Sequence, residues 1–375
     1  MVGRMRIAII TRMFPPRWLG GTEIAAYNIA QHLAGRGYDV HVITSMDKGL
    51  PQVTTKGGFH IHRLKYPRLG LLSTVPFSVA AVAVLRRINP SLVHVQCPFY
   101  GMAGYLYSKL TKKPYVVYFR GDDAYLPYSG TRFFLKLIVR NAAKVIALTE
   151  HMRRAVREQY DRDALVIPNG VDVTRFADLS REAARAEFNI KENEQVVIFV
   201  GSLIPVKGIK YLVEAMNIVI QHFPEARLLI VGDGSERQKL EVLVMKLNLG
   251  KSVTFVGRIE NAKVPEYLTA SDVFALPSLS EGFPNVILEA MATGLPIVTT
   301  NVTGLPEIVK DGENGFVVEP QNSQQLAERI LLILDNKILR EKMTVNDKGW
   351  LEHNTWEKIT QKLEGVYNYV SVERN

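Results

Sequence analysis

The sequence has little cysteine and no cluster of metal-ligating residues. Its single cysteine, Cys97, cannot form an internal disulfide, and no group of cysteines and histidines has the spacing of a zinc site. The first ten residues contain two arginines but no apolar run long enough for the core of a secretory signal peptide. We therefore expect a cytoplasmic protein that needs no metal and no other cofactor.

No stretch of the sequence is a clear membrane span. Residues 69–85 are uncharged and stand at the lower length limit for crossing a bilayer. Pro76 interrupts this stretch, and alanine and serine dilute it, so a buried or interfacial helix is favoured. The chain of 375 residues is 47% hydrophobic and 22% charged. That composition excludes disorder, collagen-like repeats and coiled coil, and the length indicates two or three domains.

Negative charge is scarce in the first half of the chain. Residues 1–172 contain 24 lysines and arginines against 10 aspartates and glutamates, whereas the remaining residues contain 22 and 27. Such asymmetry indicates that the first half faces something anionic. A nucleic-acid-binding protein would also need interleaved aromatic residues or a recognised module, and none is present. A lipid surface or a phosphorylated substrate is therefore the favoured partner, and nucleic acid is not.

Strand-like and helix-like runs alternate along the chain, which predicts an α/β fold with doubly wound parallel sheets. The alternation stops over residues 171–194 and then restarts. We expect an N-terminal Rossmann-like domain at 1–172, a second at 173–350, and a C-terminal helix within 351–375 that packs back on the first. The predicted strands span residues 6–11, 39–44, 59–64, 92–96, 115–119, 145–149 and 165–168, then 196–201, 228–232, 253–257, 273–277, 297–300 and 316–319.

The most informative motif is Glu281-Gly282-Phe283-Pro284-Asn285, followed by Glu289. A predicted strand ends just before it, and a predicted helix begins at Asn285. Ligands of open α/β sheets bind beyond the carboxyl ends of strands, which is where Glu281 lies. Glu289 lies among apolar helix residues, where an unpaired carboxylate would be costly. It needs hydrogen-bond donors, and sugar hydroxyls can supply them.

The whole chain resembles the retaining glycosyltransferases of the GT-B fold (glycosyl transferases group 1), a family that includes glycogen synthases, sucrose synthases and phosphatidylinositol mannosyltransferases. The resemblance rests on EGFPNVILEAMATGLPIV from Glu281, GSLIPVKG from Gly201, LIVGDGSE from Leu229, IPNGVD from Ile167 and GGTE from Gly20. It implies two domains facing a cleft. It also implies transfer of a hexosyl group from a UDP-sugar or GDP-mannose to an acceptor hydroxyl, with the anomeric configuration kept.

The resemblance assigns roles to individual residues. Lys207 stands at the start of a predicted helix, where unsatisfied N–H groups favour anions, and would hold the donor diphosphate. Glu281 would bind the hydroxyls of the donor sugar, and Glu289 those of the ribose. We take Lys207, Glu281 and Arg120 as candidate catalytic residues. The predicted donor-binding set is Gly20, Gly21, Ser202, Lys207, Gly232, Gly234, Gly257, Arg258, Glu281, Gly282, Phe283, Pro284, Asn285 and Glu289.

Two positions depart from the family pattern. Ser202 stands where arginine is common, so Lys207, Arg12 or Arg17 would carry more of the phosphate contact. Arg120 stands where many relatives have histidine; arginine cannot act as a base, so we expect it to clamp a donor or acceptor group. The candidate acceptor-binding residues are Arg12, Arg17, Asp122 and Asp123. The acceptor would be a glycan or a lipid-linked or phosphorylated compound, approached by a protein that binds anionic membranes peripherally.

Several alternatives fit less well. Asp161-Arg162-Asp163 matches a metal-binding motif of another glycosyltransferase fold, but its position favours a solvated turn, and we expect metal-independent catalysis. Gly232-Asp233-Gly234 lacks the third glycine of a nicotinamide site. A glycosidase could use Glu281 and Glu289 but would have no use for a phosphate site. A UDP-sugar epimerase of the same fold remains open. No carboxylate of the first half is placed as a nucleophile, which favours a front-face mechanism.

Overall fold

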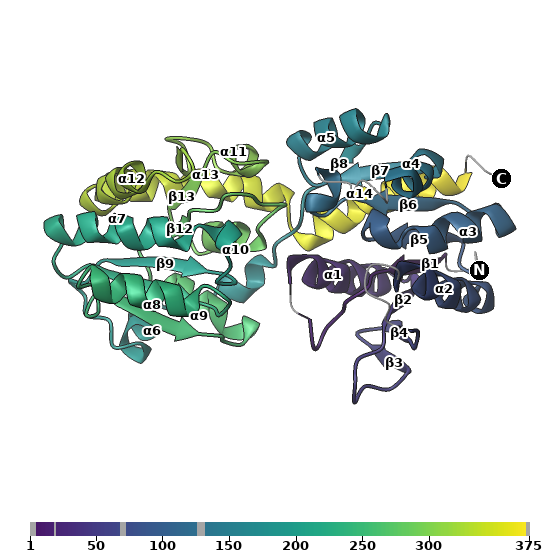
Figure 1. Ribbon diagram of the computed structural model, residues 1–375, viewed down its shortest axis with the longest axis horizontal. Coiled ribbons are helices and arrows are strands. Elements are labelled where there is room, and N and C mark those ends of the chain that lie inside the picture. The colour runs from purple at the N-terminus through teal and green to yellow at the C-terminus, as the bar shows by residue number, and fades with distance from the viewer. Residues whose placement is uncertain (1–4, 19, 68–72, 126–131, 373–375) are drawn as a thin grey trace. The chain divides into compact units, whose positions relative to one another are not determined.

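The computed structural model describes residues 5–18, 20–67, 73–125 and 132–372 (Figure 1). Contacts divide the chain into two compact units: unit 1 comprises residues up to Gly170 and from Trp356 onward, and unit 2 spans Val171–Thr355. The division lies at 170/171 and 355/356 rather than at the expected 172/173 and 350/351. Val171 pairs with Thr355 in an isolated bridge, and its N–H donates to Asn354 O at 3.0 Å. The chain therefore enters and leaves unit 2 along neighbouring segments.

Unit 1 is built on an eight-stranded sheet in the order β3-β4-β2-β1-β5-β6-β7-β8. All neighbouring strands are parallel except β3, which pairs antiparallel with β4. The strands are β1 (Arg6–Ile10), β2 (Asp39–Ser45), β3 (Val53–Lys56), β4 (Phe59–Leu64), β5 (Leu92–Val95), β6 (Tyr115–Tyr118), β7 (Lys144–Ala147) and β8 (Leu165–Val166). The sequence did not predict β3, because its residues are largely exposed and carry no buried run.

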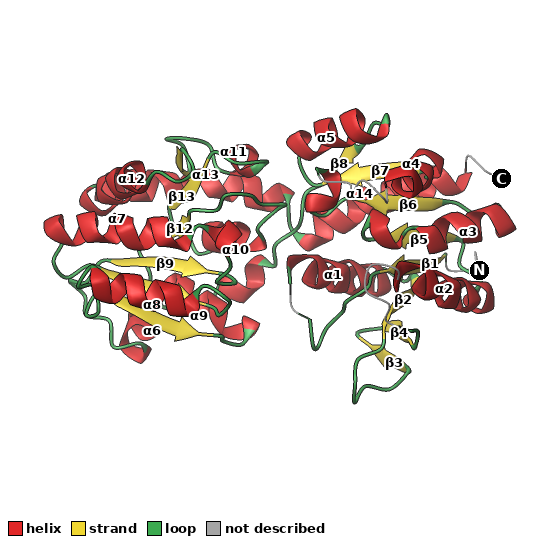
Figure 2. Ribbon diagram, in the orientation of Figure 1, coloured by secondary structure: helices red, strands yellow, loops and turns green. Residues whose placement is uncertain are grey.

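Two layers of helices cover this sheet (Figure 2). The crossover through α1 (Gly21–Gly35) runs one way along the sheet, and those through α2 (Thr74–Ile88), α3 (Met102–Thr111), α4 (Arg132–Asn141) and α5 (Glu150–Tyr160) run the other way. Right-handed crossovers therefore place α1 on one face and α2–α5 on the opposite face. Consecutive helices of this second layer contact one another.

The C-terminal helix α14 (Trp356–Val372) lies in unit 1 and packs against α1. It buries the stripe that its sequence shows, from Trp356 through Ile359 and Leu363 to Tyr367. The Tyr367 hydroxyl lies 2.5 Å from His94 Nδ1 on β5. Because α14 supplies part of the buried interior of unit 1, it is an integral part of that unit's fold.

Unit 2 contains a six-stranded, entirely parallel sheet in the order β11-β10-β9-β12-β13-β14. Its strands are β9 (Val196–Val200), β10 (Arg227–Val231), β11 (Val253–Gly257), β12 (Val273–Leu276), β13 (Ile297–Thr300) and β14 (Gly315–Val318). Its helices are α6 (Arg181–Glu187), α7 (Ile209–His222), α8 (Arg237–Lys246), α9 (Val264–Thr269), α10 (Asn285–Ala292), α11 (Leu305–Ile308), α12 (Ser323–Asp335) and α13 (Lys337–His353).

Both sheets reverse their strand order once. In unit 1 the chain builds outward from β1 and then restarts on its other side with β5; in unit 2 the same happens at β9 and β12. The loops after these strand pairs diverge and leave a crevice, where open α/β sheets bind ligands. The topology thus predicts one binding site in each unit.

The uncharged stretch at 69–85 forms part of α2, although residues 69–72 lie outside the described part of the chain. Phe77, Ala81 and Leu85 are buried, whereas Val75 and Val79 are exposed. Among the helices that the structure describes, none is both long and apolar enough to cross a bilayer.

Candidate functional site

The predicted donor-binding residues of unit 2 gather at the carboxyl edge of its sheet. Lys207 follows β9, Gly234 follows β10, and Glu281 follows β12, so the β9/β12 crevice lies between the loops of Lys207 and Glu281. Glycine allows these loops to approach closely. A Cβ on Gly208, at φ +60°, would lie 2.2 Å from Pro277 O, and one on Gly234 would lie 2.3 Å from Leu203 O. Loop packing alone therefore requires glycine at both positions.

Lys207 and Glu281 form an ion pair across this crevice. Lys207 Nζ lies 2.5 Å from Glu281 Oε1, and Ser278 Oγ donates to the same oxygen at 2.6 Å. Glu281 is buried, and the Thr303 hydroxyl holds its backbone oxygen at 2.6 Å. Both of these donors contact Oε1 of Glu281, and neither contacts its other carboxyl oxygen, Oε2. The carboxylate is thus fixed in orientation, while the ammonium group of Lys207 remains partly exposed.

Glu289 projects from α10 and pairs with Arg175, which lies on the 3₁₀ turn Val173–Phe176. Glu289 Oε1 lies 3.4 Å from Arg175 Nη1, and Arg175 Nη2 also donates to Asn261 O at 2.6 Å. Burial raises the pKa of the Glu289 carboxyl, and the Arg175 charge opposes this shift. The guanidinium of Arg175 therefore supplies a hydrogen-bond donor to the Glu289 carboxylate, as its apolar surroundings require. The sequence did not identify Arg175, because no local pattern links residues 114 positions apart.

The remaining predicted donor residues of unit 2 lie on neighbouring loops. The Gly232 N–H donates to Gly257 O at 2.8 Å, and both glycines have positive φ. Arg258 and Ser202 are exposed. Gly282, Phe283 and Pro284 connect β12 to α10, which begins at Asn285 as predicted.

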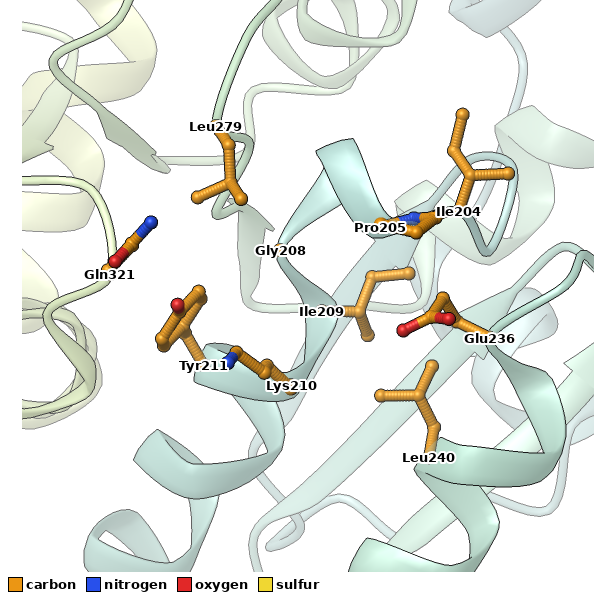
Figure 3. A pocket seen from close by; sticks show the side chains of 10 residues that line it. All are labelled: Ile204, Pro205, Gly208, Ile209, Lys210, Tyr211, Glu236, Leu240, Leu279 and Gln321. Atoms are coloured by element: carbon orange, nitrogen blue, oxygen red, sulfur yellow. The ribbon is translucent and has the colours of Figure 1, made fainter.

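A cavity of about 310 Å³ opens beside Gly208 at the same edge of the sheet (Figure 3). Ile204, Lys210, Tyr211, Glu236 and Gln321 are among the side chains around it. Lys207, Glu281 and Glu289 do not line it. This cavity therefore adjoins the predicted phosphate-binding turn, but neither the Lys207–Glu281 ion pair nor Glu289 lines it.

A second cavity, of about 270 Å³, lies at the β1/β5 crevice of unit 1. Its lining comes from the loops after β1, β5 and β6 and from the start of α1. The lining residues are Thr11, Arg12, Met13, Thr22, Glu23, Cys97, Phe99, Tyr100, Arg120, Gly121 and Asp123. Gly20 precedes α1 and Gly21 is its first residue, but neither lines this cavity.

Arg120 is the most unusual residue of this cavity. Its side chain is 7% exposed and lies over the Tyr118 ring at 4.4 Å from the centroid. None of its three guanidinium nitrogens has a hydrogen-bond partner within the described chain. Burial lowers the pKa of this guanidinium, and the nearby Tyr118 and Asp123 oppose the shift. A buried cation with five unpaired N–H donors is suited to a ligand with several acceptor oxygens.

Asp123 and Glu23 are the acidic groups beside Arg120. Asp123 Oδ1 accepts the Gly121 N–H at 2.8 Å, whereas Oδ2 has no partner among described residues, and burial raises the pKa of Asp123 to about 7. Burial also raises the pKa of Glu23. The shift at Asp123 reduces the negative charge of the cavity at neutral pH.

The other predicted acceptor-binding residues have varied positions. Arg12 lines the cavity and donates to the Tyr100 hydroxyl at 3.1 Å. Arg17 lies 3.9 Å from Asp47 and does not line the cavity. The side chain of Asp122 lies outside the part of the chain that the structure describes.

The Asp161-Arg162-Asp163 segment is an exposed turn, as expected. Asp161 ends α5 and pairs with Arg140 at 3.0 Å, and Asp163 pairs with Arg153 at 2.9 Å. Across residues 5–372, excluding the undescribed segments, no group of three acidic, histidine or cysteine side chains is arranged to hold a metal ion.

Comparison with known proteins agrees with this organisation. Residues 180–350 match the family model described as Glycosyl transferases group 1, and residues 19–175 match that of Glycosyltransferase Family 4. N-acetyl-alpha-D-glucosaminyl L-malate synthase of Bacillus anthracis is 26% identical, covering 97% of each chain. Phosphatidyl-myo-inositol mannosyltransferase of Mycobacterium leprae is 26% identical, covering 94% of each. Sucrose-phosphate synthase from Thermosynechococcus elongatus has a TM-score of 0.89 at 26% identity, covering 99% and 100%.

Proposed function

Because this chain belongs to the group 1 glycosyltransferases of the GT-B fold, we propose that it transfers a hexosyl group from a nucleotide diphosphosugar to an acceptor hydroxyl with retention of configuration. The observation that carries the proposal is the Lys207–Glu281 ion pair at the β9/β12 crevice of unit 2. In this pair, Lys207 provides a cation that can bind a diphosphate, and Glu281 provides an oriented carboxylate that can bind sugar hydroxyls.

Unit 2 would hold the donor. The N-terminus of α7 directly after Lys207 offers backbone N–H groups and a favourable dipole to a diphosphate. When phosphate oxygens approach, Lys207 can exchange its contact with Glu281 for a contact with them. Glu281 then keeps the Ser278 hydroxyl and can accept hydrogen bonds from the sugar. As the bond to the phosphate breaks, Lys207 stabilises the negative charge that develops on it.

Glu289 would accept the ribose hydroxyls. Its pairing with Arg175 opposes the rise in the pKa of this carboxyl that burial causes, and a charged acceptor forms stronger hydrogen bonds to hydroxyls. Arg175 is therefore a positioning residue in this proposal.

Unit 1 would hold an anionic acceptor in its β1/β5 cavity. Arg120 supplies a fork of unpaired donors, Arg12 adds a second cation, and the raised pKa of Asp123 limits repulsion. A carboxylate or phosphate fits this arrangement best. The names of the three relatives above mention a malate, a phosphatidylinositol and a sucrose phosphate, all compounds with such a group.

We propose a front-face mechanism without a metal. The bond between the anomeric carbon and the phosphate oxygen breaks as the acceptor oxygen bonds to that carbon on the same face. The acceptor proton passes to the departing phosphate oxygen. Lys207 supplies the positive charge at the diphosphate that a metal ion would otherwise supply.

An assay of donor use tests this function. UDP-, GDP- and ADP-sugars are incubated with malate and with sugar phosphates as acceptors, and products are analysed by NMR for the anomeric configuration. We expect one donor class to give a glycoside of retained configuration, and EDTA to leave the rate unchanged. Inverted products, a free C2-epimerised sugar nucleotide, or activity that EDTA abolishes and manganese restores would each contradict the proposal.

A further inference from the structure

The outer surface of helices α2, α3 and α4 exposes large apolar side chains. Val75 and Val79 on α2 are 63% and 65% exposed, Leu110 on α3 is 64% exposed, and Phe133 and Phe134 on α4 are 74% and 54% exposed. Monomeric soluble proteins rarely group exposed apolar residues of this size, and such groups mark interaction surfaces.

These side chains lie on one continuous layer. Helix α3 contacts both α2 and α4, and all three cover the same face of the unit 1 sheet. On α2, the exposed residues Val75, Val79 and Ala83 recur every four positions, whereas Phe77 and Leu85 point into the core. The exposed stripe therefore runs along the side of the helix that faces away from the sheet.

The charged side chains of α2, α3 and α4 are all basic. Helices α2, α3 and α4 contain no aspartate or glutamate. The basic residues on them, or directly after α3, that form no ion pair within the described chain are Arg86, Arg87, Lys109, Lys112, Arg132 and Lys136. We call the exposed apolar residues and these basic residues together the α2–α4 face.

A pair of exposed apolar residues on α8 lacks this charge pattern. Val242 and Met245 on α8 are 56% and 66% exposed, but α8 also carries Glu241 and Lys246. The α8 pair therefore provides a control with similar hydrophobicity and mixed charge.

We infer that the α2–α4 face docks onto the surface of a bilayer that contains anionic lipids. Apolar side chains would enter the boundary between headgroups and acyl chains, and the surrounding lysines and arginines would contact lipid phosphates. A second copy of this chain is a poorer occupant, because two acid-free basic surfaces would repel each other. The inference gives the proposed transfer reaction a location at a membrane, but binding itself requires neither donor nor acceptor.

Cosedimentation of the full chain with lipid vesicles, without sugar nucleotide or acceptor, tests this inference. Vesicles of phosphatidylcholine alone are compared with vesicles that also contain phosphatidylglycerol, at low and at high salt. We expect the protein to bind the vesicles with phosphatidylglycerol at low salt, and to be released by high salt.

Variants locate the contact. Arg86→Gln/Arg87→Gln should lower the partition coefficient by about 30-fold, since each basic residue contributes about fivefold near an anionic surface. Val75→Ser/Val79→Ser and Phe133→Ser/Phe134→Ser should each lower it by about tenfold. Val242→Ser/Met245→Ser on α8 should leave it unchanged. Because all these side chains are exposed, the variants should keep the wild-type circular dichroism and nucleotide affinity.

Three results would overturn the inference: no vesicle binding, equal binding to both kinds of vesicle, or binding that the α2–α4 variants leave intact. A dimer in light scattering that these variants dissociate, with no vesicle binding, would show a second copy to be the occupant instead. Nucleotide titration with the same protein separates the two proposals, since a chain that binds nucleotide but no vesicles would refute only the docking face.

Discussion

At the residue scale, Arg120 lowers the free energy of unfolding of the protein but is well suited to bind an anionic ligand. Its guanidinium is buried without a hydrogen-bond partner in the described chain, and leaving buried charged donors unsatisfied costs free energy of folding. Proteins keep such groups where a ligand completes their hydrogen bonds. The energetic argument and the binding argument therefore point to the same residue.

Replacing Arg120 separates these effects. Arg120→Met should raise the melting temperature by a few degrees, because it removes the unpaired charge, and should lower kcat/KM for the acceptor by about 100-fold or more. Arg154→Met, at an exposed site on α5, should change neither quantity. Thermal unfolding and steady-state kinetics measure both. A destabilised Arg120→Met with wild-type kinetics would show that the arginine has only a structural role.

Asp347, on α13 of unit 2, is a second buried group without satisfied hydrogen bonds. Neither carboxyl oxygen has a partner among the described residues, and burial raises the pKa of Asp347 from 3.8 to about 8. The folded state therefore keeps a proton that the unfolded chain releases above its ordinary pKa. The free energy of unfolding must fall as the pH rises from about 4 to about 8 on account of this group.

The variant Asp347→Asn removes this dependence while nearly preserving the shape of the side chain. We expect it to melt a few degrees above the wild type at pH 8 and at nearly the same temperature near pH 4. Melting curves across this pH range provide the measurement. If the difference between the two proteins does not grow with pH, the carboxyl is ionised in the folded state and our assignment is wrong.

At the element scale, the turn between β9 and α7 depends on Gly208. Its φ of +60° is unfavourable for other residues, and a Cβ there would collide with Pro277 O. Because Pro277 begins the loop that carries Glu281, this contact sets how closely the two site loops approach.

Gly208→Ala should therefore destabilise the protein by about 2 kcal/mol or more and weaken nucleotide binding. Gly349→Ala is the matched control in the same unit, since a Cβ on this residue of α13 meets nothing within 4 Å. The control should gain about 0.5–1 kcal/mol from helix propensity. Urea denaturation measures both changes; equal effects of the two substitutions would show that the close approach is unimportant.

The elements themselves were largely predictable, for a physical reason. Parallel strands buried on both faces leave continuous apolar runs such as those of β1 and β9. The strand β3 was missed because it is a short exposed edge strand, stabilised by pairing with β4 rather than by burial. The amphipathic stripe of α14 predicted that the helix would be buried.

At the scale of the whole molecule, the contacts that define the candidate sites were not predictable. Glu281 was recognised from its motif, but its pairing with Lys207 joins residues 74 positions apart, and only the β9/β12 strand order brings them together. Arg120 likewise has no hydrogen-bond partner in the described chain because none of the loops after β1, β5 and β6 places an acceptor within reach of its guanidinium. Local patterns can identify such side chains but cannot state their partners.

The central claim is that the Lys207–Glu281 crevice binds the diphosphate of a sugar nucleotide. Isothermal titration of UDP, GDP and ADP into wild type, Lys207→Ala and the exposed control Lys246→Ala tests it most directly. We predict micromolar binding of at least one nucleotide to wild type and to Lys246→Ala, and about 100-fold weaker binding to Lys207→Ala. Equal affinity in all three proteins, or no binding of any nucleotide to the wild type, would contradict the claim.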